Sequence, residues 1–221
     1  MRWFELLLVI TIAIADPLFK GLYFLKHGPS PGILFDNSRW TYGLIHEIIC
    51  LLLLGYVLSR RSLRIRDLGL RWSLRACSTG FFLAIAFMIA SATANLLLRR
   101  LHLAWFGFID NSPTAKDFFA HPSFMAIPFT LFNPFFEELI VRAYLMTELL
   151  DLTGSSLLAV FCSTALQFSY HLYYGWVGAL SISTGFLVFS LYYLRARRAT
   201  PVIVAHGFID ILGFIRLWWF G

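Results

Sequence analysis

The sequence predicts an all-α protein, a polytopic bundle of about seven transmembrane helices that forms one domain over residues 1–221. Hydrophobic residues make up 59% of the chain and charged residues only 14%, whereas a soluble domain carries about 25% charged residues. Several apolar runs reach about 20 residues, the length that a helix needs to cross a bilayer. Polar and apolar residues do not alternate in these runs, which argues against the strands of a membrane β-barrel.

The apolar runs place the expected spans in order along the chain. They cover residues 3–25, 40–58, 76–98, 123–149, 156–172, 176–194 and 201–220. The first run contains Glu5 and continues past Asp16, so we expect a membrane span rather than a cleavable signal peptide. Loop 101–122 is rich in aromatic residues, so we expect it to lie along the membrane interface, where it could gate lateral entry.

The net charge of +6 comes from arginines that flank the spans, so it indicates membrane topology and not a nucleic-acid partner. One group follows the second span and another follows the sixth: Arg60, Arg61, Arg64, Arg66, Arg71, Arg75, Arg195, Arg197 and Arg198. The positive-inside rule then places the N-terminus in the cytoplasm. We expect the protein in the plasma (inner) membrane. For segment 60–75, two interpretations stay open: a topology determinant, or an amphipathic surface helix that binds anionic lipid or substrate.

The fourth predicted span contains an unusual charged motif, Asn133-Pro-Phe-Phe-Glu-Glu-Leu-Ile-Val-Arg142. A charge near the bilayer centre costs about 2.5–3.5 kcal/mol on insertion scales, so such residues need partners or a function. Glu138 and Arg142 are four positions apart and can pair on one helix face, while Glu137 points elsewhere. We therefore predict that Glu138 is tethered and Glu137 is the working carboxylate. Pro134 lies just upstream, where a bend would suit a wet cavity.

Two later spans contribute further polar groups. His171 lies at the end of the fifth span, and the seventh contains His206 and Asp210, four positions apart. Ionisable groups inside a membrane usually face the interior of the bundle and mark functional sites. We therefore predict that they share one site with Glu137. In the second span, Glu47 lies near the interface, where we expect it to snorkel or to be paired.

These three groups, in this order on successive helices, resemble the CAAX prenyl protease and bacteriocin-processing (Abi) family of glutamic-type intramembrane proteases. The family motifs are Glu-Glu-x-x-x-Arg, Phe-x-x-x-His, and His-x-x-x-Asn or Asp. The first and third motifs are complete here, whereas the second keeps its histidine and has Gln167 where the family has Phe. The resemblance covers about residues 132–212, within a protease core that we place at about residues 122–215.

The resemblance implies an intramembrane endopeptidase that cleaves a membrane-associated peptide or protein. In it, Glu137 would act as general base on a water molecule, and His171 would orient or protonate that water or the leaving group. Asp210 would orient His206, whose N–H would face the developing negative charge. The ion pair of Glu138 would hold the motif helix. The implied partners are membrane lipid and the membrane-associated substrate, and the implied mechanism uses no cofactor.

Three alternatives stay open. Carboxylates with two histidines are also a zinc-like ligand set, although the His-Glu-x-x-His helix of many zinc proteases is missing. A non-proteolytic relative, such as a bacteriocin-immunity or partner-stabilising factor, is kept open by Gln167. A transporter with a proton relay would show an internal repeat, and the two halves of the sequence show none. Whether the substrate is prenylated is not determined by the sequence.

Overall fold

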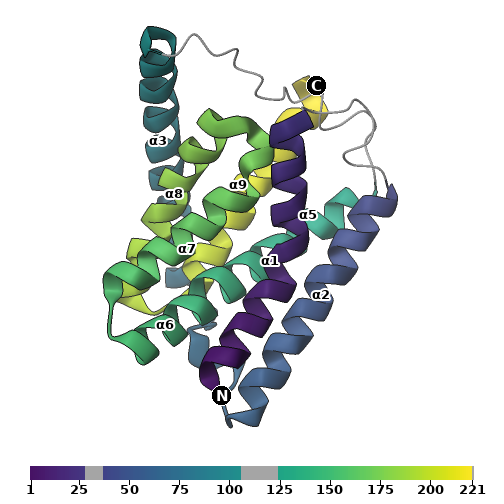
Figure 1. Cartoon of the computed structure of the whole chain (residues 1–221), viewed down its shortest axis with the longest axis vertical. Helices are drawn as coiled ribbons and strands as arrows, with labels where there is room; N and C mark the ends of the chain where they lie inside the picture. Colours follow the sequence, from purple (N-terminus) through teal and green to yellow (C-terminus); the bar gives the residue numbers. More distant parts are fainter. Residues whose placement is uncertain (28–36, 106–123, 221) are drawn as a thin grey trace.

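The computed structural model describes residues 1–27, 37–105 and 124–220, and these residues form helices joined by short turns (Figure 1). The predicted all-α class is therefore confirmed for this part of the chain. Five helical segments are long and apolar enough to cross a membrane. They lie in the helices α1 (Arg2–His27), α2 (Asn37–Arg60), α3 (Leu74–Trp105), α8 (Gly175–Ala196) and α9 (Ala199–Phe220).

The predicted fourth span, 123–149, is not one regular helix. It consists of α5 (Ala126–Glu137), a π-helical segment η2 (Glu138–Tyr144) and α6 (Leu145–Thr153). Pro134 lies inside α5, and a proline removes a backbone N–H and disturbs the regular hydrogen-bond pattern of the helix. Wider π-helical turns occur frequently at functional sites, and here the change of helix type falls between the two glutamates of the motif.

The predicted fifth span is short and ends in a sharp reversal. Helix α7 (Ser156–Tyr170) begins where the hydroxyl of Ser155 accepts a hydrogen bond from the backbone N–H of Leu158 at 3.2 Å. After α7, the 3-10 turn η3 (Leu172–Tyr174) leads directly into α8. This reversal leaves His171 at the end of a helix, where the chain changes direction.

The broken helix lies at the centre of the bundle. All seven residues of η2 are buried, and α5 contacts both α2 and α9, while α7 contacts α1, α6 and α8. A second apolar cluster joins α3, α8 and α9 and includes Phe87, Phe186 and Phe189. In Figure 1, α5 and α6 cross the middle of the view between the longer helices. The charged motif is thus surrounded by protein on all sides.

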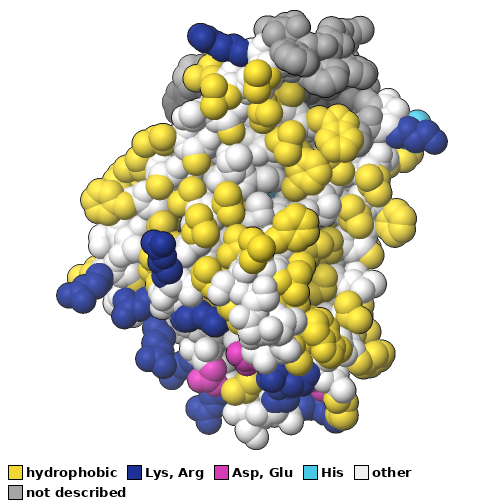
Figure 2. Space-filling model, turned by 60° about the vertical axis from the view of Figure 1, so that its left-hand side comes forward, with side chains coloured by type: hydrophobic (Ala, Val, Ile, Leu, Met, Phe, Trp, Pro, Cys, Tyr) yellow, Lys and Arg dark blue, Asp and Glu magenta, His cyan; other side chains and the backbone are white. Residues whose placement is uncertain are grey.

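The basic segments gather at one end of the molecule. Figure 1 shows the N-terminus at one end and the C-terminus at the other. Figure 2 shows most Lys and Arg side chains near the lower end, while hydrophobic side chains cover the middle. Segment 60–75 is a chain reversal around the 3-10 turn η1 (Ile65–Leu68) and not an amphipathic helix. Residues 106–122, most of the predicted interfacial loop, lie outside the described residues, and the cytoplasmic orientation stays a prediction.

Candidate active site

Glu138 and Arg142 form a buried, bidentate ion pair at the centre of the site. The guanidinium Nε donates to Glu138 Oε2 at 2.9 Å and Nη2 donates to Oε1 at 3.2 Å. Its Nη1 donates to the hydroxyls of Ser163, on α7, at 2.8 Å and of Ser190, on α8, at 2.9 Å. Both charged side chains are fully buried. Because a buried ion pair must be hydrogen-bonded on all sides to offset its desolvation, this geometry fixes three helices relative to one another.

His206 lies between two carboxylates. Its Nδ1 donates to Glu138 Oε1 at 2.9 Å, because an ionised carboxylate can only accept. Its Nε2 is 3.5 Å from Asp210 Oδ1, and the Asp210 side chain is 26% exposed. The sequence predicted that Asp210 alone orients this ring. The structure adds Glu138 as the closer partner, which connects the first and third motifs directly.

Glu137 is buried but has a different environment from its neighbour. The hydroxyl of Tyr170 donates to Glu137 Oε2 at 2.7 Å, and the side chain is only 7% exposed. The carboxylate is close enough to His171 and His206 to interact electrostatically with both rings. Within the described residues, Glu137 forms no ion pair, whereas Glu138 is bonded to both Arg142 and His206. The two adjacent glutamates are thus chemically distinct.

His171 has a defined tautomer when neutral. Its Nδ1 donates to the backbone carbonyl of Gln167 at 2.7 Å, and a carbonyl can only accept, so Nδ1 carries the proton. Nε2 of the neutral ring is then a hydrogen-bond acceptor. Phe186 on α8 has its ring centroid 5.3 Å from that of His171 and 5.1 Å from that of His206. This phenylalanine therefore packs against both imidazoles.

Two neighbours of the site were missed by sequence reasoning. Tyr170 directly precedes His171, and the end of α7 between them turns both side chains towards the same region. Phe186 belongs to an apolar stretch of the sixth predicted span, so no sequence signal distinguished it from other core residues. By contrast, Tyr170 is adjacent in sequence to the motif residue His171, and this position could have identified it as a candidate site residue.

A third carboxylate also lies beside the site. Glu47 on α2 is only 3% exposed and accepts a hydrogen bond from Asn133 Nδ2 at 2.8 Å. It is close enough to Glu137, Asp210 and His206 for electrostatic interaction with each. Glu47 is thus paired through Oε1 only, since Oε2 has no hydrogen-bond partner among the described residues, and its burial contradicts the alternative that it snorkels. Only the packing of α2 against α5 brings this acid to the motif.

Gln167 marks the departure from the family motif, and its side chain has an unusual environment. It is fully buried, and neither its amide nitrogen nor its amide oxygen has a hydrogen-bond partner among the described residues. Its backbone carbonyl still accepts from His171. The replaced side chain therefore affects local packing, while the hydrogen bond that holds the histidine does not depend on it.

The zinc alternative would require three or more ligand side chains to converge on one point. Among the residues that the structure describes, no three His, Cys, Asp or Glu side chains come together in a way that could hold a metal ion. The acids and imidazoles instead pair with one another, as Glu138 does with His206. The metal-independent mechanism stays a prediction, which the chelator test proposed below addresses.

Fold and site together define a helical membrane protein whose interior brings two glutamates and two histidines together from separate helices. Residues 119–212 match the family described as type II CAAX prenyl endopeptidase Rce1-like. This match covers the segment that carries the three motifs, so the family resemblance predicted from those motifs is confirmed. No curated protein and no solved structure matches the chain. The matched segment contains every residue of the three motifs, whereas Glu47 lies outside it.

Proposed function

We propose that the protein is an intramembrane endopeptidase that cleaves a membrane-associated peptide or protein by glutamate-activated water. One observation carries this proposal. Of two adjacent buried glutamates, Glu138 is bonded to Arg142 and His206, while Glu137 is held only by the hydroxyl of Tyr170 among the described residues. An unpaired carboxylate beside an acceptor imidazole is the arrangement that a general base needs.

In the proposed reaction, Glu137 takes a proton from water while the water oxygen attacks the scissile carbonyl carbon. The hydrogen bond from Tyr170 fixes one carboxylate oxygen, so the other oxygen is available to the water. Nε2 of His171 accepts the second hydrogen of the water and orients its lone pair. The proton held by Glu137 then passes to the leaving amine as the C–N bond breaks, which restores the carboxylate.

The negative charge on the tetrahedral intermediate needs a hydrogen-bond donor. His206 is fixed through Nδ1 by Glu138, and when its ring is protonated on both nitrogens, the Nε2–H is offered to the oxyanion. Asp210 Oδ1 lies 3.5 Å from this nitrogen and stabilises the protonated ring electrostatically. This role is compatible with Asp where the family motif allows Asn or Asp, because the donor is the imidazole and not the residue at 210.

The family description supports a CAAX-type substrate with a prenylated cysteine. A buried site in an apolar bundle suits a lipid-attached peptide, because the lipid partitions into the bilayer beside the protein. We therefore propose a prenylated substrate and test it against the same peptide without the lipid.

The test uses purified protein in proteoliposomes, a farnesylated CAAX-type peptide and its unprenylated form, with products detected by mass spectrometry. We expect Glu137→Gln to lower the cleavage rate by about 10²–10⁴-fold, the usual contribution of a general base. Glu148→Gln is the matched control, because Glu148 is an equally buried glutamate that pairs with Arg2 and Arg61 away from the site. The Glu148→Gln protein should still cleave the farnesylated peptide, provided that it is folded.

Three results would contradict the proposal. Cleavage retained by Glu137→Gln would remove the assigned base, and loss of cleavage with 1,10-phenanthroline would support the zinc alternative. A wild-type protein that cleaves neither peptide, but whose cellular function survives Glu137→Gln, would favour a non-proteolytic family member.

A further inference from the structure

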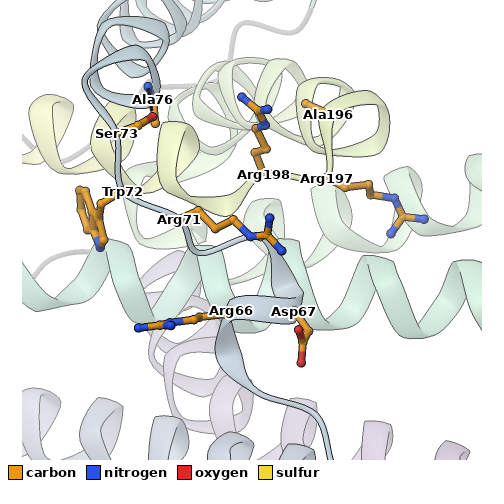
Figure 3. Close-up of a pocket in the computed structure, with 10 residues that line it drawn as sticks. Arg66, Asp67, Arg71, Trp72, Ser73, Ala76, Ala196, Arg197 and Arg198 are labelled. Atoms are coloured by element: carbon orange, nitrogen blue, oxygen red, sulfur yellow. Dashed lines mark hydrogen bonds between the residues drawn. The ribbon is translucent and has the colours of Figure 1, made fainter.

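A charged pocket lies at the basic end of the molecule, and its lining includes none of the residues of the candidate active site. It is formed between the chain segment around η1 and the turn that joins α8 to α9 (Figure 3). Its volume is about 400 Å³. Four of its lining residues are arginines and one is an acid: Arg66, Arg71, Arg197, Arg198 and Asp67.

Backbone contacts fix the two walls of this pocket. The N–H of Ala199 donates to the carbonyl of Gly69 at 3.0 Å, and the N–H of Arg71 donates to the hydroxyl of Thr200 at 2.8 Å. Gly69 has φ +88°, and a Cβ there would collide with the carbonyl oxygen of Arg197. Only glycine permits this approach. The two segments that carry the arginines are thus held together at the backbone, while the arginine side chains point in different directions (Figure 3).

The positive charge of the pocket is not neutralised within the described structure. Asp67, the acid of the lining, accepts from the backbone N–H of Arg64 at 2.8 Å and so faces its own segment. Arg197 donates to Thr147 at 3.2 Å, a neutral partner. The guanidiniums of Arg66, Arg71 and Arg198 form no ion pair with any described residue. Guanidinium groups bind phosphate oxygens in bidentate geometry, so this pocket suits a phosphate ester.

The position of the pocket favours a lipid as the source of that phosphate. It lies where two membrane-length segments end, at the start of α3 and the end of α8. Trp72 lines the pocket and is 57% exposed, and Leu74, one residue after the lining Ser73, is 91% exposed. Exposed Trp beside a span is typical of the membrane interface. Acyl chains could therefore lie along the apolar surface while the headgroup enters the pocket.

We propose that this pocket binds the phosphate group of an anionic phospholipid headgroup, through Arg71 and Arg198 with Arg66 at the rim. The proposal is independent of proteolysis, since none of these residues touches the Glu137 site. It also gives the arginines a role besides topology, because two segments that lie far apart in the sequence both contribute arginines to one pocket.

The test is a titration of the purified full-length protein in neutral detergent with short-chain phosphatidylglycerol, followed by its thermal unfolding midpoint. Parallel titrations use short-chain phosphatidylcholine and inorganic phosphate. We expect phosphatidylglycerol to raise the midpoint at concentrations where the other two have little effect. For Arg71→Gln/Arg198→Gln, the apparent affinity should fall about thirtyfold, the loss expected for two cationic side chains near an anionic lipid.

The matched control is Arg60→Gln/Arg75→Gln, which removes the same charge from exposed arginines of the same end that do not line the pocket. The apparent affinity of this variant for phosphatidylglycerol should stay within about threefold of the wild-type value, because exposed charges outside the pocket contribute only a screened attraction. An equal loss in both double variants would overturn the pocket in favour of diffuse attraction. An equal response to inorganic phosphate would overturn the lipid as its source, and no response to phosphatidylglycerol would overturn the proposal. Circular dichroism establishes that each variant is folded.

Discussion

In the interior, the guanidinium of Arg142 is bonded to the carboxylate of Glu138 and to two serine hydroxyls. At the basic end, by contrast, Arg71 and Arg198 have no ion-pair partner among the described residues. The difference follows from solvation. A charge removed from water must be satisfied by the protein itself, whereas water and counter-ions stabilise an exposed guanidinium until a ligand arrives. Arg142 therefore has its partners within the fold, whereas the arginines of the pocket are available to an external anion.

The largest effect is expected from breaking the interior pair. Arg142→Met leaves Glu138 as a buried carboxylate without its main partner, which should destabilise the protein by about 3–5 kcal/mol. Thermal or denaturant unfolding in detergent measures this. The double variant Glu138→Gln/Arg142→Met removes both charges and should recover part of the loss. If the double variant is as unstable as the sum of the single variants, the two side chains are not coupled as described.

An intermediate effect is expected at a neutral polar group in the same interior. Gln167→Met keeps the side-chain volume and removes two polar atoms that have no partner among the described residues. Because an unpaired buried polar group costs about 1–3 kcal/mol, this variant should be more stable than the wild type. Unfolding in detergent provides the measurement, with Gln167→Glu as the opposite case. A less stable Gln167→Met would mean that the amide binds water or another partner in the native protein.

The smallest effect is expected at the surface. Arg71→Gln relieves repulsion among like charges in the arginine pocket, so without anionic lipid its unfolding midpoint should rise by about 1 °C or less. In about 0.5 M salt the difference should disappear, because salt screens exposed charges. The same salt change should leave the destabilisation of Arg142→Met almost unchanged. A large, salt-independent loss in Arg71→Gln would mean that this side chain is structural.

The sequence predicted well those features that depend on local spacing. Composition and run length predicted the helical membrane class, and the spacing of Glu138 and Arg142 predicted an ion pair that the structure contains. The sequence was less informative about the fourth predicted span, which is a broken helix, and about the fifth, which is a short helix. Hydropathy averages over a window, so it does not detect a change of helix type within an apolar run.

What the sequence determined by itself is thus the helical class and the order of the three motifs, because helix periodicity and bilayer thickness act within one segment. Only the tertiary structure decided which groups meet. His206 contacts Glu138 from 68 positions away, Glu47 reaches the site through the packing of α2 on α5, and Gly69 brings two arginine segments together. Such contacts depend on how complementary helix surfaces pack, and no spacing within a single helix encodes them.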